Sequence, residues 1–152
     1  MTQEYKFFNS IPGDLRYTNA TDFAEYFGSV LSTGFLHTDN VPGMVVSVVP
    51  GTLTTSVSSG GAIMKGRWYK NTTDEVLEHA IPEPSLDRID RIVLRLDLRN
   101  AERNILLYVK TGVADASPVA PLLQRDNFIY ELSLAQILVR ANTVQLLQSD
   151  LI

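Results

Sequence analysis

The sequence of 152 residues contains no cysteine, which excludes disulfide bonds and thiolate catalysis. The lack of cysteine fits synthesis in a reducing cytosol. Histidine is nearly absent as well: the only two are His37 and His79. Neither has a second histidine at a helical spacing, so the pattern does not indicate a metal site. We expect His37 to lie in a loop and His79 on the face of a strand.

Long apolar runs and a basic excess are also missing. No stretch approaches the roughly 18 apolar residues that a membrane-spanning helix needs, and the polar N-terminus does not resemble a signal peptide. We therefore expect no membrane insertion. The formal net charge is −4, whereas nucleic-acid-binding domains usually carry a basic patch or stripe. We accordingly expect no nucleic-acid partner.

Two runs of alternating apolar residues lie in the middle of the chain. The first contains Ile92, Leu94, Leu96 and Leu98, and the second contains Ile105, Leu107 and Val109. Apolar residues at period two on both sides of a polar break are typical of a β-hairpin. The break, residues 99–103, is too long for a tight two-residue turn and predicts a bulged or longer loop.

One helix is expected, over residues 19–34. Asn19 or Thr21 is a suitable N-cap, Asp22 lies where the helix dipole favours negative charge, and Gly34 is a suitable left-handed cap. Its apolar stripe consists of Phe23, Tyr26, Phe27, Val30 and Leu31. We expect this stripe to pack on a sheet as part of the core. Residues 1–18 are predicted to form an extended arm with a turn at residues 11–14.

The other segments are short β-branched or aromatic runs separated by turn signals. Residues 44–49 predict a central strand, because both faces are apolar, whereas residues 52–59 predict a loop or a weak edge strand. Further strands are expected at 62–70 with a break at Gly66, 75–80, 128–139 and 144–147, and a long connection at 111–127. The predicted fold is mainly β: an antiparallel β-sandwich with one N-terminal α-helix packed at its side, in a single domain spanning 1–152.

The sequence carries no signature of catalysis. No serine lies in a Gly-x-Ser-x-Gly elbow, and the pair Gly60-Gly61 precedes a strand rather than a helix, unlike a phosphate-binding loop. Asp87, Asp90 and Asp97 each have an arginine close by in the sequence, which favours ion pairs over a catalytic pair of carboxylates. We expect no enzyme activity and no cofactor.

Two sets of residues are the candidates for a functional surface. The charged residues of the hairpin predict an ion-pair and assembly face that contacts a neighbouring loop or subunit: Arg88, Asp90, Arg91, Arg95 and Asp97. An alternative is a carbohydrate-binding β-sandwich that contacts a cell wall, in which aromatic rings stack on a sugar. Its candidate residues are Trp68, Tyr69 and Tyr108.

Several sequence blocks occur in a distinctive order. They are Phe7–Ser10, Asp22–Phe27, Gly61–Asn71, Arg88–Asp97, Arg103–Lys110 and Ile129–Val139, with Pro118, Pro121 and Leu122 ahead of the last. In this order they resemble the N-terminal "shoulder" domain of baseplate and receptor-binding proteins in long-tailed siphophages of Gram-positive bacteria. The Arg-x-Asp-Arg-Ile-Val-Leu-Arg-Leu-Asp block is the most distinctive, and the resemblance extends over nearly the whole chain.

The resemblance implies a structural part of the virion, made in the host cytoplasm and located in the tail. Such a domain is a β-sandwich with an N-terminal helix, is often a homotrimer, and attaches a receptor-binding protein to other tail or baseplate proteins. It contributes to host adsorption and touches the host surface only indirectly. In the family a neck and a saccharide-binding head follow, which these 152 residues do not include. The chain is therefore expected to be a stand-alone shoulder module or a piece of a longer protein.

Overall fold

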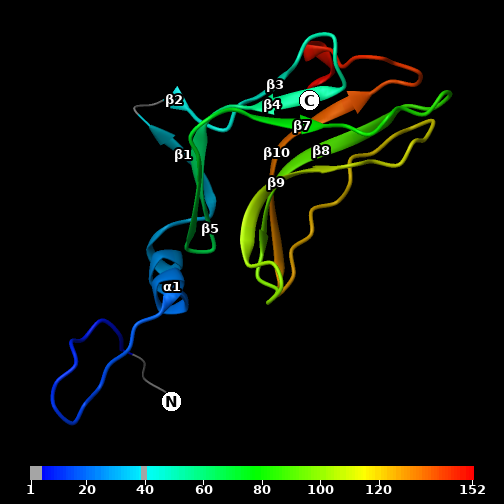
Figure 1. The fold of residues 1–152 in the computed structure, drawn as a ribbon. Coiled ribbons are helices and arrows are strands. Elements are labelled where there is room, and N and C mark those ends of the chain that lie inside the picture. The colour runs from blue at the N-terminus through cyan, green and yellow to red at the C-terminus, as the bar shows by residue number, and fades with distance from the viewer. Residues whose placement is uncertain (1–4, 39–40) are drawn as a thin grey trace.

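The computed structural model describes residues 5–38 and 41–152 of the chain. It is mainly β, with antiparallel sheets and one α-helix near the N-terminus, as the sequence predicts (Figure 1). The helix is α1 (Ala20–Val30), and a short 3-10 helix, η1 (Gln148–Asp150), lies near the C-terminus. The strands are β1 (Gly34–Thr38), β2 (Val41–Pro42), β3 (Val46–Val48), β4 (Thr54–Val57), β5 (Gly60–Met64), β6 (Arg67–Asn71), β7 (Glu75–Glu78), β8 (Arg88–Asp97), β9 (Asn104–Lys110) and β10 (Ile129–Val139).

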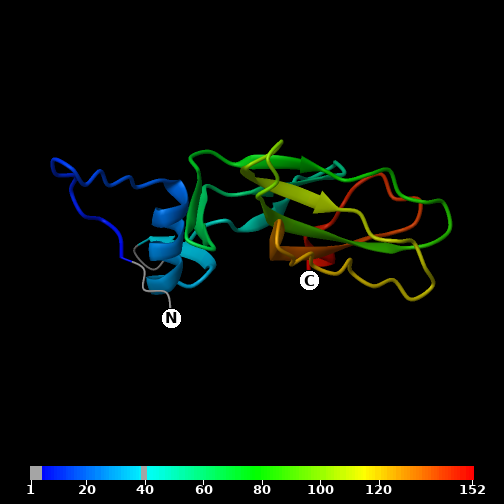
Figure 2. The same ribbon diagram turned by 90° about the horizontal axis from the view of Figure 1, so that it is seen from below.

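The strands form three antiparallel sheets, with the orders β2-β1-β5-β6, β3-β4-β7 and β10-β8-β9. The last two sheets share one hydrophobic cluster, which contains the fully buried residues Val57 of β4, Leu94 of β8 and Ile137 of β10. This shared core makes them the two layers of a sandwich. The hairpin β5–β6 connects the sandwich to α1, and Figure 2 shows the helix and the N-terminal arm at one end of an elongated molecule.

The predicted hairpin is confirmed as β8 and β9. Asp97 pairs with Asn104 at the closed end and Arg91 pairs with Lys110 at the other, with residues 98–103 as the loop. On its other side β8 pairs with β10 along its whole length, through an irregularity between Ser133 and Ala135. β8 is therefore the central strand of its sheet, and the strand predicted over 128–139 is confirmed as β10.

The roles predicted for the two strands before Gly60 are exchanged. The Val-rich segment 44–49 forms β3 at an edge, and the Thr-rich segment 52–59 contains β4, the central strand of the same sheet. Composition misled the prediction because Thr55 and Val57 alternate with half-buried neighbours, and the buried Thr55 hydroxyl has a hydrogen-bond partner inside the sandwich. A polar strand can be central when its inward hydroxyls are bonded.

The helix begins as predicted but ends early. Asn19 accepts hydrogen bonds from the N–H groups of Thr21 and Asp22, and Asp22 accepts one from the N–H of Asn19, which is a capping box. The predicted end at Gly34 is wrong. Leu31 is already extended, with φ of −122°, and Gly34 begins β1, because the chain must straighten to pair with β5.

The aromatic stripe of α1 lies outside the core, contrary to the prediction. Phe23, Tyr26 and Phe27 are between 42% and 50% exposed, and Val30 and Leu31 are exposed as well. The helix instead contacts the turn between β5 and β6 through Ala24 and Gly28; these small residues permit a close approach. A hairpin tip covers only a narrow strip of a helix, so the aromatic side remains open.

Three smaller predictions can be compared with the structure. The turn at residues 11–14 is present in an otherwise extended arm, and residues 1–4 lie outside the described part. The strand predicted over 144–147 is wrong; that segment is irregular and leads into η1. His37 lies in β1 rather than in a loop, because the chain from Gly34 pairs with β5 and then with β2; of the loop predicted there, residues 39–40 are not described.

Candidate functional site

The Asp90 carboxylate lies inside the sandwich and is completely buried. Its Oδ2 accepts a hydrogen bond from His79 Nδ1 at 2.8 Å, and its Oδ1 accepts bonds from Arg88 Nε and the Gly112 N–H, both at 2.9 Å. Arg88 also donates to the carbonyl oxygens of Ala80 and Ile81. Asp90 thus joins β8 to the end of β7, to the segment that follows it, and to the segment after β9.

These hydrogen bonds also determine the ionisation of Asp90. Burial by itself raises the pKa of the Asp90 carboxyl, but the hydrogen bonds from His79, Arg88 and Gly112 outweigh it, and the pKa lies below its ordinary value of 3.8. The group is therefore a carboxylate at neutral pH. The ion pair with Arg88 and the hydrogen bonds from His79 and the Gly112 N–H together offset the cost of burying its charge.

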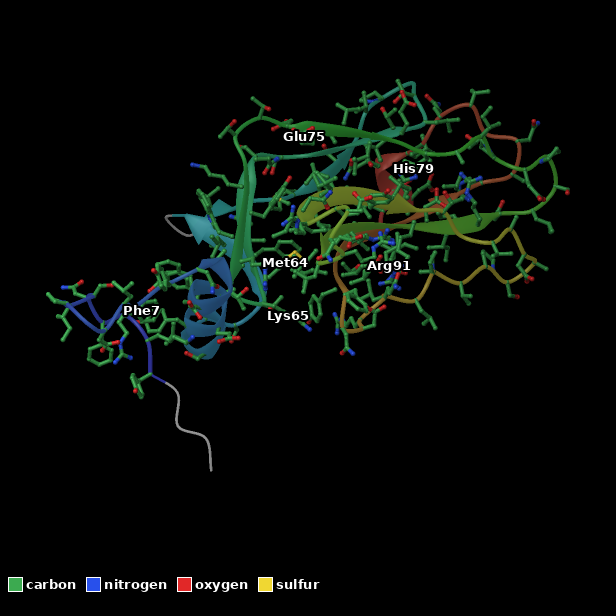
Figure 3. The ribbon with its side chains drawn as sticks, turned by 60° about the horizontal axis from the view of Figure 1, so that its bottom comes forward. Phe7, Met64, Lys65, Glu75, His79 and Arg91 are labelled. Atoms are coloured by element: carbon green, nitrogen blue, oxygen red, sulfur yellow. The ribbon has the colours of Figure 1, made fainter. Side chains whose placement is uncertain are left out.

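His79 connects Asp90 to Thr55 of β4. The Thr55 hydroxyl lies 3.1 Å from His79 Nε2, so hydroxyl, imidazole and carboxylate stand in the order of a hydrolase triad. Thr55 is fully buried, however, and the main surface pockets of the described chain are lined by other residues. A substrate has no access to the hydroxyl. The arrangement therefore acts as a structural tie between the two sheets. Figure 3 labels His79, the middle residue of the three.

A second buried carboxylate, Glu131 of β10, was not identified from the sequence. Its Oε1 accepts two hydrogen bonds from Arg95, and its Oε2 accepts bonds from Lys110 Nζ at 2.6 Å and from the Gln124 N–H at 2.7 Å. Burial raises the pKa of Glu131, but these donors outweigh it and lower the pKa below the ordinary 4.5. The sequence signal that points to Glu131 is an acidic residue inside a largely apolar strand. In the sheet this residue pairs in register with Arg95.

The long connection between β9 and β10 is held by the same side chains. Arg91 donates to the carbonyl of Pro121 at 2.8 Å and to the Ser133 hydroxyl, and Lys110 donates to the carbonyl of Leu122 at 2.9 Å. Although the connection contains no regular structure, its backbone is thus anchored at several points by β8 and β9.

The five hairpin residues predicted as one face divide between two. Alternation along β8 puts Arg88 and Asp90 on the core face and Arg91, Arg95 and Asp97 on the other. All five have partners within this chain. Asp97 pairs with Arg99, which holds the pKa of that carboxyl below its ordinary value.

The three aromatic residues predicted for sugar stacking are not brought together on one surface. Trp68 and Tyr69 are neighbours in β6 and point to opposite sides; Trp68 is 65% exposed, whereas Tyr69 packs against the core. Burial, with a smaller effect of Glu75, raises the pKa of Tyr69. Tyr108 lies on β9 beneath the Arg95 guanidinium, which sits 4.5 Å from its ring centroid.

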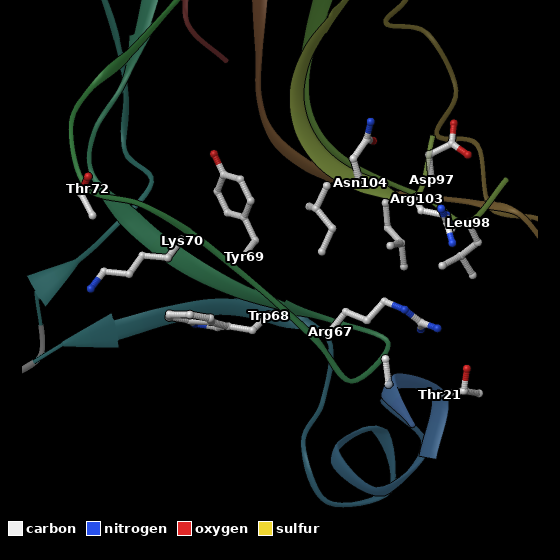
Figure 4. Close-up of a pocket in the computed structure, with 13 residues that line it drawn as sticks. Thr21, Arg67, Trp68, Tyr69, Lys70, Thr72, Asp97, Leu98, Arg103 and Asn104 are labelled. Carbon is white, nitrogen blue, oxygen red and sulfur yellow. The ribbon is translucent and has the colours of Figure 1, made fainter. Parts of the chain in front are cut away.

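A groove of about 1020 Å³ separates β6 from the end of the β8–β9 hairpin (Figure 4). We call it the β6 groove. Its β6 side is formed by Arg67, Trp68, Tyr69 and Lys70, and its other side by residues 96–98 and 103–105, with Ala20, Thr21 and Thr72 at its margins. Apolar side chains of Leu96, Leu98 and Ile105 lie beside charged ones.

A second surface is formed by the N-terminal arm and the open side of α1. We call it the arm–helix surface: Phe7, Phe8, Phe23, Tyr26, Phe27 and Val30, all of them exposed. The Phe7 ring centroid lies 5.4 Å from those of both Phe23 and Tyr26. The arm thus extends the aromatic surface of the helix. The connected rings of Phe7, Phe23, Tyr26 and Phe27 form the largest group of ring contacts among the described residues.

Within the described residues, no group of three or more His, Asp or Glu side chains is placed to hold a metal ion. None of the helices described there is long and apolar enough to cross a membrane. In comparisons with known proteins, no family model, no curated protein and no solved structure gave a significant match to the chain.

Proposed function

We propose that the chain is a non-enzymatic structural component of a phage tail, of the shoulder type that attaches a receptor-binding protein to the baseplate. In this role it is part of the virion, is made in the host cytoplasm, and touches the host surface only indirectly. The order of its sequence blocks supports this assignment, as does the mainly β fold with its N-terminal helix.

The observation that carries the proposal is the arm–helix surface. Exposed apolar residues that lie singly on a protein surface need no explanation, but a contiguous aromatic patch is typical of a site of protein association. Here Phe7 contacts both Phe23 and Tyr26, at the end of the molecule that carries the arm and the helix. We propose that copies of the chain pack together there as a homotrimer.

The charged residues of the sandwich suit a part that transmits mechanical load. Asp90 and Glu131 cross-link strands and connections from inside the body, at sites buried from solvent. A tail component must keep its shape while its partners pull on it. These buried ion pairs stiffen the sandwich, whereas the contacts between subunits are made by the arm–helix surface.

Immunogold labelling of particles of the phage that encodes the chain tests the proposal. An antibody raised against the isolated chain should label the tail tip, and pre-incubation with the chain should abolish the label. Particles that carry no label, while the same antibody detects the chain in the infected-cell lysate, would contradict a place in the virion.

A further inference from the structure

The open edge of β6 carries unpaired backbone groups. Lys65 and Gly66 have φ of +46° and +73°, so they form a two-residue turn, and the flanking pair, Met64 and Arg67, is hydrogen-bonded. Because hydrogen-bonded and non-hydrogen-bonded pairs alternate in an antiparallel ladder, Trp68 and Lys70 belong to the latter kind. Their N–H and C=O groups therefore point away from β5.

None of the strands within residues 5–38 and 41–152 pairs with β6 on that side, since β6 ends the order β2-β1-β5-β6. Two donors and two acceptors thus face the β6 groove. Both residues are solvent-exposed, and the groove beside them is open. An extended chain laid along β6 would pair with all four groups, as strands added to sheet edges do.

The charge of the β6 groove determines which kind of polypeptide segment can bind there. Three cations line it, Arg67, Lys70 and Arg103, and among the described residues none of them has an ion pair. The one carboxylate in the lining, Asp97, is neutralised by Arg99. The groove is therefore positive on a protein whose net charge is −4.

We propose that the β6 groove binds an extended acidic segment of another polypeptide, which adds to the sheet as a strand beside β6. Carboxylates on one face of the segment pair with Lys70, which lies on the Trp68 side of β6. Apolar residues on its other face lie against Leu98 and Ile105, and Arg67 and Arg103 add to the positive charge of the groove. Cations on an edge strand discourage pairing with a basic strand, so the same side chains exclude unsuitable segments.

The arm of a second copy does not fit this description. Between residues 5 and 18 it carries Lys6 and Arg16 against the single carboxylate of Asp14. The inference thus concerns a partner other than this chain and a surface other than the arm–helix surface. It stands or falls separately from the function proposed above.

A synthetic peptide tests the proposal, with the only tryptophan of the chain, Trp68, as the reporter. The probe is an octapeptide of alternating Glu and Val, titrated into the full chain at 50 mM salt while Trp68 fluorescence is followed. Saturable binding is expected. A peptide of alternating Lys and Val should not bind, and neither should the acidic peptide N-methylated at alternate residues, because it keeps the charge but loses the donors.

Variants separate the groove from general charge. Lys70→Glu should weaken binding about tenfold or more, since it places like charges opposite each other. Lys65→Glu is the matched control: it makes the same charge change on the same hairpin, outside the β6 groove, and should leave binding within about twofold.

A backbone variant checks the strand pairing itself. Lys70→Pro removes an N–H that points outward, which an edge strand tolerates. Relative to Lys70→Ala it should lose about a further two- to tenfold in affinity, the value of one hydrogen bond. Circular dichroism establishes that both variants fold; if Lys70→Pro does not fold, the N-methylated peptide decides the point.

Four outcomes would overturn the proposal. They are no binding at millimolar peptide, equal binding of the N-methylated peptide, an equal effect of Lys65→Glu, and equal affinities of Lys70→Pro and Lys70→Ala when both fold. Saturable binding of polygalacturonate that competes with the peptide and is lost in Trp68→Ala would identify a saccharide groove instead.

Discussion

His79 Nδ1 lies 2.8 Å from Oδ2 of Asp90, and this buried hydrogen bond joins the two layers of the sandwich from within. On its other side the imidazole reaches Thr55 of β4 at 3.1 Å. The His79 ring therefore spans from the β3-β4-β7 sheet to β8. Three polar side chains in a fully buried position specify how the two sheets are aligned, which apolar packing alone does less strictly.

Replacing Asp90 with Ala should destabilise the protein by about 3–5 kcal/mol, because it leaves Arg88 buried without its partner. For a domain of this size the melting temperature should fall by roughly 10 °C. Thermal unfolding followed by circular dichroism measures the change. The exposed Glu78→Ala, with an expected effect within about 0.5 kcal/mol, is the control. A loss in Asp90→Ala no larger than in this control would show that the buried network contributes nothing.

Replacing Glu131 with Gln should loosen the connection between β9 and β10. The amide keeps the shape of the carboxylate but removes the charge that Arg95 and Lys110 bind, which should cost about 2–4 kcal/mol. Because Gln124 is held by the same side chain, trypsin should cleave after Arg125 faster than in the parent chain. Glu102→Gln, at an exposed position, is the matched control. Equal cleavage rates in all three chains would refute this role of Glu131.

Stability should fall as the pH drops below about 5. The pKa values of Asp90 and Glu131 in the folded protein lie below their ordinary values of 3.8 and 4.5, so the unfolded chain takes up protons first. Their contribution is complete above those ordinary values and is lost as the pH falls through the folded pKa values. Urea unfolding at pH 7, 5, 4 and 3 measures it. The double variant Asp90→Asn/Glu131→Gln should show a flatter dependence, and an unchanged slope would contradict the assignment.

The parts of the fold that the sequence predicted are those that local patterns determine. The period of two from Ile92 to Val109 identified the β8–β9 hairpin, and Asn19 with Asp22 identified the start of α1. Both signals act within one hairpin or one turn of helix, so no knowledge of distant partners was needed. The same holds for the break at Gly66, which is the turn between β5 and β6.

The errors arose where a distant partner decides the outcome. Whether β4 or β3 is central depends on β7, which pairs with β4 and lies some 20 residues further along the chain. The spacing of Phe23, Tyr26 and Phe27 shows that the helix is amphipathic but does not reveal that it contacts only a hairpin tip. Glu131 and His79 became recognisable as site residues only when register and folding brought Arg95 and Asp90 to them.

Replacing Gly66 with Ala should break the contact between α1 and the turn that connects β5 and β6. Gly66 has φ of +73°, which disfavours any residue with a Cβ, and a Cβ there would lie 1.8 Å from the carbonyl oxygen of Ala24. Backbone atoms cannot give way by so much, so we expect the contact to open at a cost of about 2–4 kcal/mol. Hydrogen exchange should then be faster in residues 20–30 and unchanged in β8. Gly13→Ala, also at positive φ but with free space around it, is the control for the backbone effect alone. Unaltered protection of the helix in Gly66→Ala would refute the close packing.

The exposed aromatic side of α1 leads to a prediction that distinguishes an assembly surface from a core. A charge placed in a core would cost several kcal/mol, but Phe23 and Tyr26 are 48% and 50% exposed. The free energy of unfolding of the double variant Phe23→Glu/Tyr26→Glu should therefore lie within about 1 kcal/mol of the value for the parent chain. Its association should nevertheless change: light scattering after size exclusion should give a trimer for the parent chain and a monomer for the variant. Leu122→Glu, at an exposed apolar residue of the connection after β9, should remain trimeric. A parent chain that is monomeric at every concentration tested would contradict self-association through this surface, and a strongly destabilised variant would contradict its exposure.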